Sequence, residues 1–274
     1  MIAQEAKVYY IGTATALLEI GGLRLLTDPA FDPGDTTYTT PVYTLHKLKP
    51  PTVTADYIGH IDHVLLSHDH HLDNLDHQGM QLLTKVASVI TTTQGADRLN
   101  NQSARPGDVP APKGIHAIGL DNWQTVEIPT KDGRVLTITG TPCRHGPAGS
   151  DRGPVTGFVL NFKGETGNAI YITGDTVYYE GVEEVAHRYN IALILLFIGA
   201  ARIAAVGPAH LTMTVEESIK AARLFPPAVI TPLHFEGWEH FSEGHDEIIR
   251  GYTAAGLLDR LHWAPPYTPS SPSK

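Results

Sequence analysis

Short apolar runs separated by turn residues fill most of the chain and predict a protein rich in strands. Strands are predicted at 7–11, 16–20, 23–26, 64–66, 88–92, 126–128, 134–139, 157–162, 169–173, 192–197 and 228–231. Gly21 and Gly22 predict a tight hairpin turn between the second and third of these strands. Helices are expected at 79–86, 182–189, 215–225 and 246–255, with Thr214 as the N-cap of the third. Each half of the chain is therefore rich in strands and closes in helices.

Residues 30–57 interrupt this pattern, because they are rich in Pro, Thr and Tyr and show little periodicity. A loop of this length in a compact domain is usually functional or disordered. We expect it to cover a substrate, with Phe31, Tyr38 and Tyr43 as candidate wall residues. A solvated insertion without a role is the alternative.

Polar chemistry is concentrated in residues 67–76, directly after the apolar run at 64–66. Three histidines and three aspartates fall within nine residues of this stretch. Neutral imidazole and carboxylate groups suit zinc, manganese and iron, so the stretch predicts a transition-metal site.

Extended geometry narrows the choice of ligands within this stretch. If the chain stays extended past Ser67, His68 and His70 point to one side and His71 to the other. Asp73 follows after the chain has turned. The best ligands are therefore His68, His70 and Asp73, while His71 competes with His70 if the turn begins earlier.

The stretch resembles the His-x-His-x-Asp-His loop of the metallo-β-lactamase fold hydrolases. The branch it resembles most holds ascorbate-phosphate lactonases and N-acyl-phosphatidylethanolamine phospholipase D. This chain has one extra residue before Asp73, and Asn74 stands where the family has its last histidine. An amide oxygen is a poorer zinc ligand than imidazole, so a weaker second metal position is expected.

Later strand ends carry residues that extend the resemblance. It implies that His145 is the third histidine of the first metal position and that Asp175 bridges the two metals. His234 corresponds to the terminal ligand of the second position. His210 stands where this branch has a histidine near the substrate, and we expect it to donate a hydrogen bond to an oxyanion or phosphate. A hydrogen bond from His210 to a backbone carbonyl is the alternative.

The resemblance covers residues 7–262 and implies an α+β fold, a four-layer αββα sandwich with the metals at one edge between two sheets. It implies one or two Zn or Mn ions per chain. The expected ligands are His68, His70 and His145 for the first ion and Asp73, Asp175 and His234 for the second, with His71 and Asn74 as alternative ligands.

The mechanism implied by the family is hydrolysis by a metal-bound hydroxide. Asp73 would accept the proton of the nucleophilic water, and His210 would help to stabilise the developing charge. The expected substrate is a small molecule with a lactone, another ester or a phosphodiester. A non-catalytic metal-binding or regulatory protein of the same fold is the alternative, because Asn74 alters the second position.

Composition and charge exclude several other classes. The net charge is −9, which argues against a nucleic-acid partner, and Cys143 is the single cysteine. No apolar run is long enough for a membrane span, and no signal segment is evident, so a cytoplasmic protein is expected. We expect one metallo-hydrolase domain at 1–264 and a disordered Pro/Ser-rich tail at 265–274. The sequence leaves a homo-oligomer open.

Overall fold

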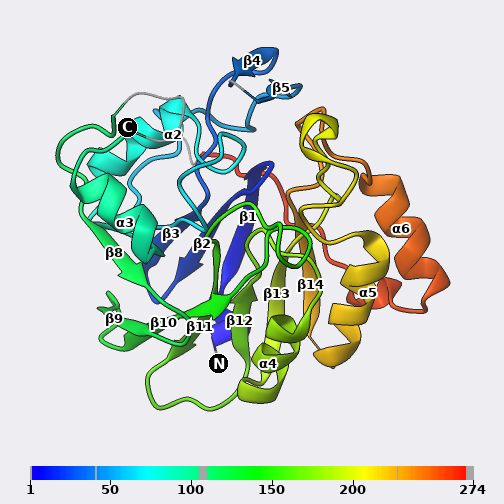
Figure 1. Cartoon of the computed structure of the whole chain (residues 1–274). Helices are drawn as coiled ribbons and strands as arrows, with labels where there is room; N and C mark the ends of the chain where they lie inside the picture. Colours follow the sequence, from blue (N-terminus) through cyan, green and yellow to red (C-terminus); the bar gives the residue numbers. More distant parts are fainter. Residues whose placement is uncertain (1, 41, 105–109, 227, 270–274) are drawn as a thin grey trace.

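Two six-stranded sheets lie face to face in the computed structural model, and helices cover the outer face of each sheet (Figure 1). The structure describes residues 2–40, 42–104, 110–226 and 228–269. This arrangement confirms the predicted four-layer αββα sandwich.

The first sheet has the order β1-β2-β3-β6-β7-β8. Its strands β1 to β3 are antiparallel, whereas β3, β6, β7 and β8 pair in parallel. Helices α2 and α3 and the 3-10 turn η1 pack on its outer face. The bounds are β1 (Lys7–Gly12), β2 (Thr15–Ile20), β3 (Leu23–Thr27), β6 (His63–Leu65), β7 (Ser88–Thr92), β8 (Ala117–Leu120), α2 (His77–Leu82), η1 (Leu83–Lys85) and α3 (Thr93–Asn100).

The second sheet has the order β14-β13-β12-β11-β10-β9. Strands β9 to β12 are antiparallel, and β12 to β14 are parallel. Helices α4, α5 and α6 contribute to the apolar cluster on its outer face. The bounds are β9 (Thr125–Pro129), β10 (Val135–Pro142), β11 (Thr156–Phe162), β12 (Ala169–Ile172), β13 (Ile191–Phe197), β14 (Val229–Leu233), α4 (Glu180–Arg188), α5 (Val215–Leu224) and α6 (His245–Ala254).

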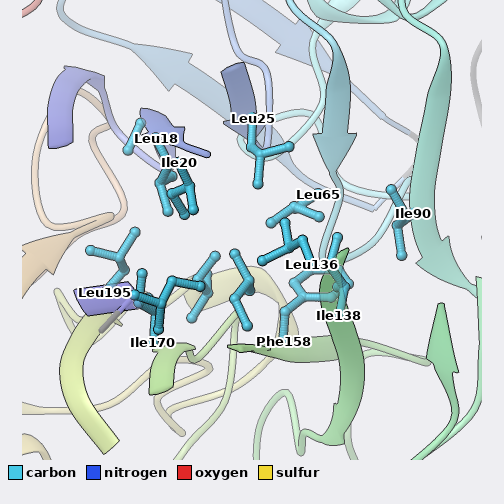
Figure 2. Packing of buried hydrophobic residues seen from close by; sticks show 14 of the residues in the cluster. Leu18, Ile20, Leu25, Leu65, Ile90, Leu136, Ile138, Phe158, Ile170 and Leu195 are labelled. Carbon is cyan, nitrogen blue, oxygen red and sulfur yellow. The ribbon is translucent and has the colours of Figure 1, made fainter. Parts of the chain in front are cut away.

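The main core lies between the two sheets. Figure 2 shows Leu18, Leu25 and Leu65 of the first sheet facing Leu136 and Phe158 of the second. Strand β13 is apolar along its whole length because side chains on both of its faces are buried, one set in this core and the other under the helices. Packing of these side chains holds the two sheets against each other, and the sheets support the loops at their edge.

Local signals in the sequence account for several element ends. Gly21 and Gly22 both have positive φ angles, +57° and +78°, as the predicted two-residue turn requires. Thr214 caps α5 in a capping box with Glu217, which confirms that prediction. Helix α2 begins two residues earlier than predicted, because Asp76 accepts a hydrogen bond from the Gly79 amide and caps it.

Residues 30–57 contain a hairpin that the sequence did not predict. It consists of β4 (Thr36–Thr39) and β5 (Thr44–Lys47) and projects above the two sheets in Figure 1. Tyr38 packs with Leu45 and Trp238, and Phe31 lies in the apolar cluster outside the first sheet. The sequence also gave no signal strong enough to predict α3 and β8.

The remaining short elements are α1 (Ile2–Glu5), η2 (Ala204–Val206) and η3 (Leu258–Arg260). The Tyr10 amide donates to the Pro265 carbonyl oxygen, and the Tyr267 amide donates to the Tyr10 carbonyl oxygen. The first residues of the tail that was expected to be disordered therefore pair with β1. Residues 270–274 of that tail lie outside the described residues. Within the described parts of the chain, no helix has the length and apolar character needed to cross a bilayer.

Candidate metal centre

Four loops bring six candidate ligands to one edge of the sandwich. Each loop follows the end of a strand: β6, β10, β12 or β14. The side chains form two buried groups, in each of which the potential ligand atoms lie within 4.8 Å of one another. The groups are His68, His71 and His145, and Asp73, Asp175 and His234.

The first group consists of three imidazoles whose nitrogens face each other. His68 Nε2 lies 2.9 Å from His71 Nδ1, and His145 Nε2 lies 3.2 Å from the same atom. Burial, followed by the neighbouring histidines, lowers the pKa of His68 and of His71 well below the usual value, and burial also lowers the pKa of His145. All three are therefore neutral near pH 7, which is the form that binds a metal.

The protein holds the second ring nitrogen of two of these histidines. His68 Nδ1 lies 2.9 Å from Ser67 Oγ, and His145 Nδ1 lies 2.8 Å from the backbone carbonyl oxygen of Leu211. The Ser67 hydroxyl and amide both donate to Asp28, at 2.7 and 2.9 Å. Such outer contacts fix the orientation of metal-binding imidazoles. The set fits a zinc or manganese ion.

The second group carries negative charge. His234 Nδ1 lies 3.1 Å from Asp175 Oδ1, and His234 Nε2 lies 3.5 Å from Asp73 Oδ2. Burial opposes the charged imidazolium, but the two carboxylates outweigh it and raise the pKa of His234 to about 10. Burial likewise opposes ionisation of Asp73, but His234 and His240 hold its pKa well below the usual value. Two ionised carboxylates and one imidazole fit a divalent cation.

Asp175 lies between the two groups. Its Oδ1 faces His234 at 3.1 Å, and its Oδ2 lies 3.8 Å from His145 Nε2. Neither ring nitrogen of His234 makes a well-aligned hydrogen bond within the described parts of the chain, although both are buried. A buried imidazole that faces carboxylates without a well-aligned hydrogen bond can direct one ring nitrogen to a bound cation. The placement supports the bridging position that the resemblance implies for Asp175.

His70 does not join either group, although extended geometry favoured it over His71. Its Nε2 lies 2.8 Å from the backbone carbonyl oxygen of Arg152. Strand β6 ends at Leu65 and the chain bends at Ser67, so the two-residue alternation of a strand does not reach these histidines. The structure instead groups His71, the alternative ligand, with His68 and His145.

Asn74 is buried beside the second group. Its Nδ2 donates to Asp175 Oδ1 at 3.4 Å, and its Oδ1 has no hydrogen-bond partner among the described residues. The amide therefore contacts a candidate ligand and leaves an acceptor free, as an alternative oxygen ligand would.

His240, rather than His210, contacts the candidate site. His210 Nδ1 lies 3.2 Å from the backbone carbonyl oxygen of Ala200, which is the structural alternative, and His210 does not line the cavity at the site. His240 does line the cavity, and its Nε2 lies 3.0 Å from Asp73 Oδ2.

Two ion pairs with buried carboxylates support the loop that carries the histidines. The Arg98 guanidinium binds both oxygens of Asp69, with Nε at 2.7 Å from Oδ2. Lys47 Nζ, on β5, donates to Asp76 Oδ2 and to the Ala30 carbonyl, each at 3.0 Å. The second pair ties the β4–β5 hairpin to the loop, so this part of residues 30–57 is a fixed wall beside the site.

A small cavity opens against the two groups. Its polar side includes His71, Asp73, His145 and His240. Most of the rest is apolar, and of the three candidate wall residues only Tyr43 lines it. The lining residues are Tyr43, Leu45, His71, Asp73, His145, Arg152, Ala201, Ile203, Val206, Leu211 and His240.

Comparison with known proteins agrees with this geometry. The Beta-lactamase superfamily domain family matches residues 23–235. The UPF0173 metal-dependent hydrolase of Carboxydothermus hydrogenoformans is 29% identical over 238 residues, covering 85% of each chain. That of Pelotomaculum thermopropionicum is 28% identical over 258 residues, covering 91% of this chain and 92% of the relative.

Solved structures share the fold over nearly the whole chain. A possible metal-dependent hydrolase from Veillonella parvula has a TM-score of 0.76 at 18% identity and covers 97% of this chain and 98% of its own. An isothiocyanate hydrolase from Delia radicum gut bacteria has a TM-score of 0.75 at 22% identity, covering 93% of this chain and 95% of its own. At these identities the similarity concerns the fold alone.

Proposed function

Because the chain belongs to the β-lactamase superfamily domain family, we propose that it is a metal-dependent hydrolase of a small lactone or other ester. The observation that carries this proposal is the convergence of six ligand-type side chains, from four separate loops, in two buried groups beside a cavity. Ligand groups that open onto a cavity are typical of catalytic rather than structural metal sites.

The two groups have the donor sets that zinc or manganese accepts. His68, His71 and His145 would hold one ion, and Asp73, Asp175 and His234 would hold a second, with Asn74 beside it. One or two ions bound there would supply Lewis-acid chemistry for the attack of water on a carbonyl or phosphoryl group.

Proton transfer falls to residues that line the cavity. Asp73 is ionised at neutral pH and can accept a proton from the attacking water at its Oδ atoms. The acyl carbon gains the hydroxyl of water, the carbon–oxygen bond of the ester breaks, and the proton ends on the departing alkoxide. His240, bonded to Asp73 and lining the cavity, is better placed than His210 to orient Asp73 and to donate toward the developing charge.

A phosphodiester remains the second candidate substrate, since the same donor set also serves phosphoryl transfer. The ester is favoured because the cavity wall is largely apolar and contributes a single cationic side chain, Arg152. Isothiocyanates belong in the same screen, because one structural neighbour is an isothiocyanate hydrolase.

The test begins with metal content, measured by elemental mass spectrometry on protein purified without chelators or a metal-affinity column. We expect about one to two equivalents of zinc or manganese. A panel of lactones, aryl esters, phosphodiesters and isothiocyanates then follows, before and after chelation and metal return. Protein that binds no metal, even after metal is added, would contradict the proposal. Full metal without hydrolysis across the panel would favour the non-catalytic alternative.

A further inference from the structure

Arg152 is fixed beside the candidate metal centre by three backbone contacts. Its amide donates to the His145 carbonyl oxygen at 2.9 Å, and its own carbonyl oxygen lies 2.8 Å from His70 Nε2. One guanidinium nitrogen donates to the Val206 carbonyl oxygen at 2.9 Å. His70, which is not grouped with the other histidines, thus helps to place an arginine that lines the cavity.

This arginine has no acidic partner among the described residues, and its Nε is buried without a hydrogen bond. Two other partly buried arginines do have acidic neighbours, because Arg98 pairs with Asp69 and Arg144 lies 3.7 Å from Glu180. Arg260 also has no acidic partner among the described residues, but its guanidinium donates to the backbone carbonyls of Ala222, Phe225 and Ala228 instead. In a chain with a net charge of −9, carboxylates are plentiful. Leaving a partly buried guanidinium unpaired costs stability unless a bound anion completes its contacts.

Tyr43 offers a second donor in the same cavity. Burial raises the pKa of its hydroxyl, with Asp73 adding to the rise and Arg152 opposing it, so the group stays protonated and lies within the field of both. The rest of the wall is apolar, formed by Leu45, Ile203, Val206 and Leu211. The cavity therefore combines two hydrogen-bond donors, one of them cationic, with an apolar surface.

We propose that Arg152 and Tyr43 form a subsite for an anionic group, a carboxylate or a phosphate, on a substrate whose body is apolar. The inference rests on the proposed function, because it places the cleaved bond at the polar side of the cavity. An arginine can pair with two oxygens of such an anion at once, which sets the position of the substrate as well as its affinity.

The experiment measures binding rather than turnover. Hexanoate, hexyl phosphate and hexan-1-ol are titrated calorimetrically into metal-loaded protein, with the metal content of every variant measured alongside. For Arg152→Gln we expect the affinity for the preferred anion to fall about tenfold or more, while hexan-1-ol binds as before. Arg152→Lys should recover part of the loss. The anion that binds the unmodified protein more tightly identifies the group as carboxylate or phosphate.

Arg144→Gln is the matched control. Arg144 is also partly buried, but it lies over the Tyr179 ring at 4.5 Å and does not line the cavity. Its replacement should leave all three ligands unaffected. The inference is overturned if neither anion binds the unmodified protein, if Arg152→Gln leaves anion binding intact, or if it weakens hexan-1-ol equally. Protein that binds no metal would contradict the proposed function instead, and the same titrations into that metal-free protein would still decide whether Arg152 binds anions.

Discussion

The two ligand groups adjoin each other, yet the same residue type behaves in opposite ways in them. Among His68, His71 and His145 the neighbours are other imidazoles, and burial keeps all three pKa values below the usual range. His234 is equally buried, but Asp73 and Asp175 raise its pKa to about 10. The charge of the neighbours, more than burial, therefore decides whether a histidine here is ready to receive a metal ion.

The difference has a consequence for metal affinity. The first group is neutral, and Ser67 and the Leu211 carbonyl hold two of its imidazoles from behind. In the second group, His234 must lose its proton before it can bind a cation. Asn74 also supplies an amide there, where the resemblance leads us to expect an imidazole. We infer that the first group binds its ion more tightly than the second.

Asp175→Ala removes a carboxylate that faces histidines of both groups and should have the largest effect. We expect the metal content to fall at both positions and turnover to drop by about three orders of magnitude. Metal content and hydrolysis of the best substrate measure the effect. Asp246→Ala, at an exposed carboxylate, serves as the control. Unimpaired turnover in Asp175→Ala would refute the assignment of both groups.

His71→Ala and His70→Ala separate the two readings of the histidine loop. His71→Ala should lose the more tightly held ion and about a hundredfold in rate, since metal affinity depends on each ligand. His70→Ala should keep its metal, and its effect should appear in KM, because His70 contacts the Arg152 backbone. The opposite outcome, with metal lost only from His70→Ala, would restore the assignment made from extended geometry.

Lys47→Met tests the buried pair that joins the β4–β5 hairpin to the histidine loop. Both side chains of this pair are almost inaccessible, 1% for Lys47 and 0% for Asp76. Removing the cation leaves a buried carboxylate unpaired, so we expect a loss of about 3–5 kcal/mol in the free energy of unfolding, measured by urea denaturation.

The double variant Lys47→Met/Asp76→Asn is the matched control for that loss. Asparagine removes the charge but keeps an N-cap for α2, so part of the stability should return. A double variant as unstable as the single one would mean that Lys47 acts through packing, as its position 5.7 Å from the Trp238 ring would allow.

Much of the sandwich was predictable because its strands follow simple apolar patterns. The continuous apolar run of β13 is buried on both faces of the sheet. Thr214 and Glu217, three residues apart, form the capping box that begins α5. The β4–β5 hairpin was not predictable, because β4 is mostly polar and the contacts that hold the hairpin, Lys47 with Asp76 and Tyr38 with Trp238, join residues distant in the sequence.

The site shows the same limit. His68, His145, Asp175 and His234 come together as the order of the strand ends suggested. The choice between His70 and His71 depended on where the strand stops, and element ends are the least certain part of sequence interpretation. Contacts such as that of His240 with Asp73 join residues far apart in the chain, and no local pattern announces them.

Arg98→Gln should have the smallest effect on stability among these variants. Arg98 pairs with Asp69, which lies next to His68 in the first group. Burial opposes ionisation of Asp69, but the Arg98 guanidinium outweighs it and lowers the pKa of Asp69 to about 2. A carboxyl with a lowered pKa in the folded state stabilises the fold above its unfolded pKa, near 3.8, and this contribution is lost as the pH falls toward 2. Arg98→Gln should therefore cost about 2 kcal/mol at pH 7, because the buried Asp69 loses its guanidinium partner and keeps only weaker contacts such as that with His70, 3.9 Å away.

That cost should shrink as the pH falls from about 4 toward 2, since the unfolded chain then binds a proton at Asp69 and the ion pair contributes less to stability. Unfolding of metal-free protein, measured by urea denaturation at pH 7 and near pH 3, checks this without interference from acid release of the ions. A cost that is the same at both pH values would show that Arg98 supports the histidine loop through packing rather than through the charge of Asp69.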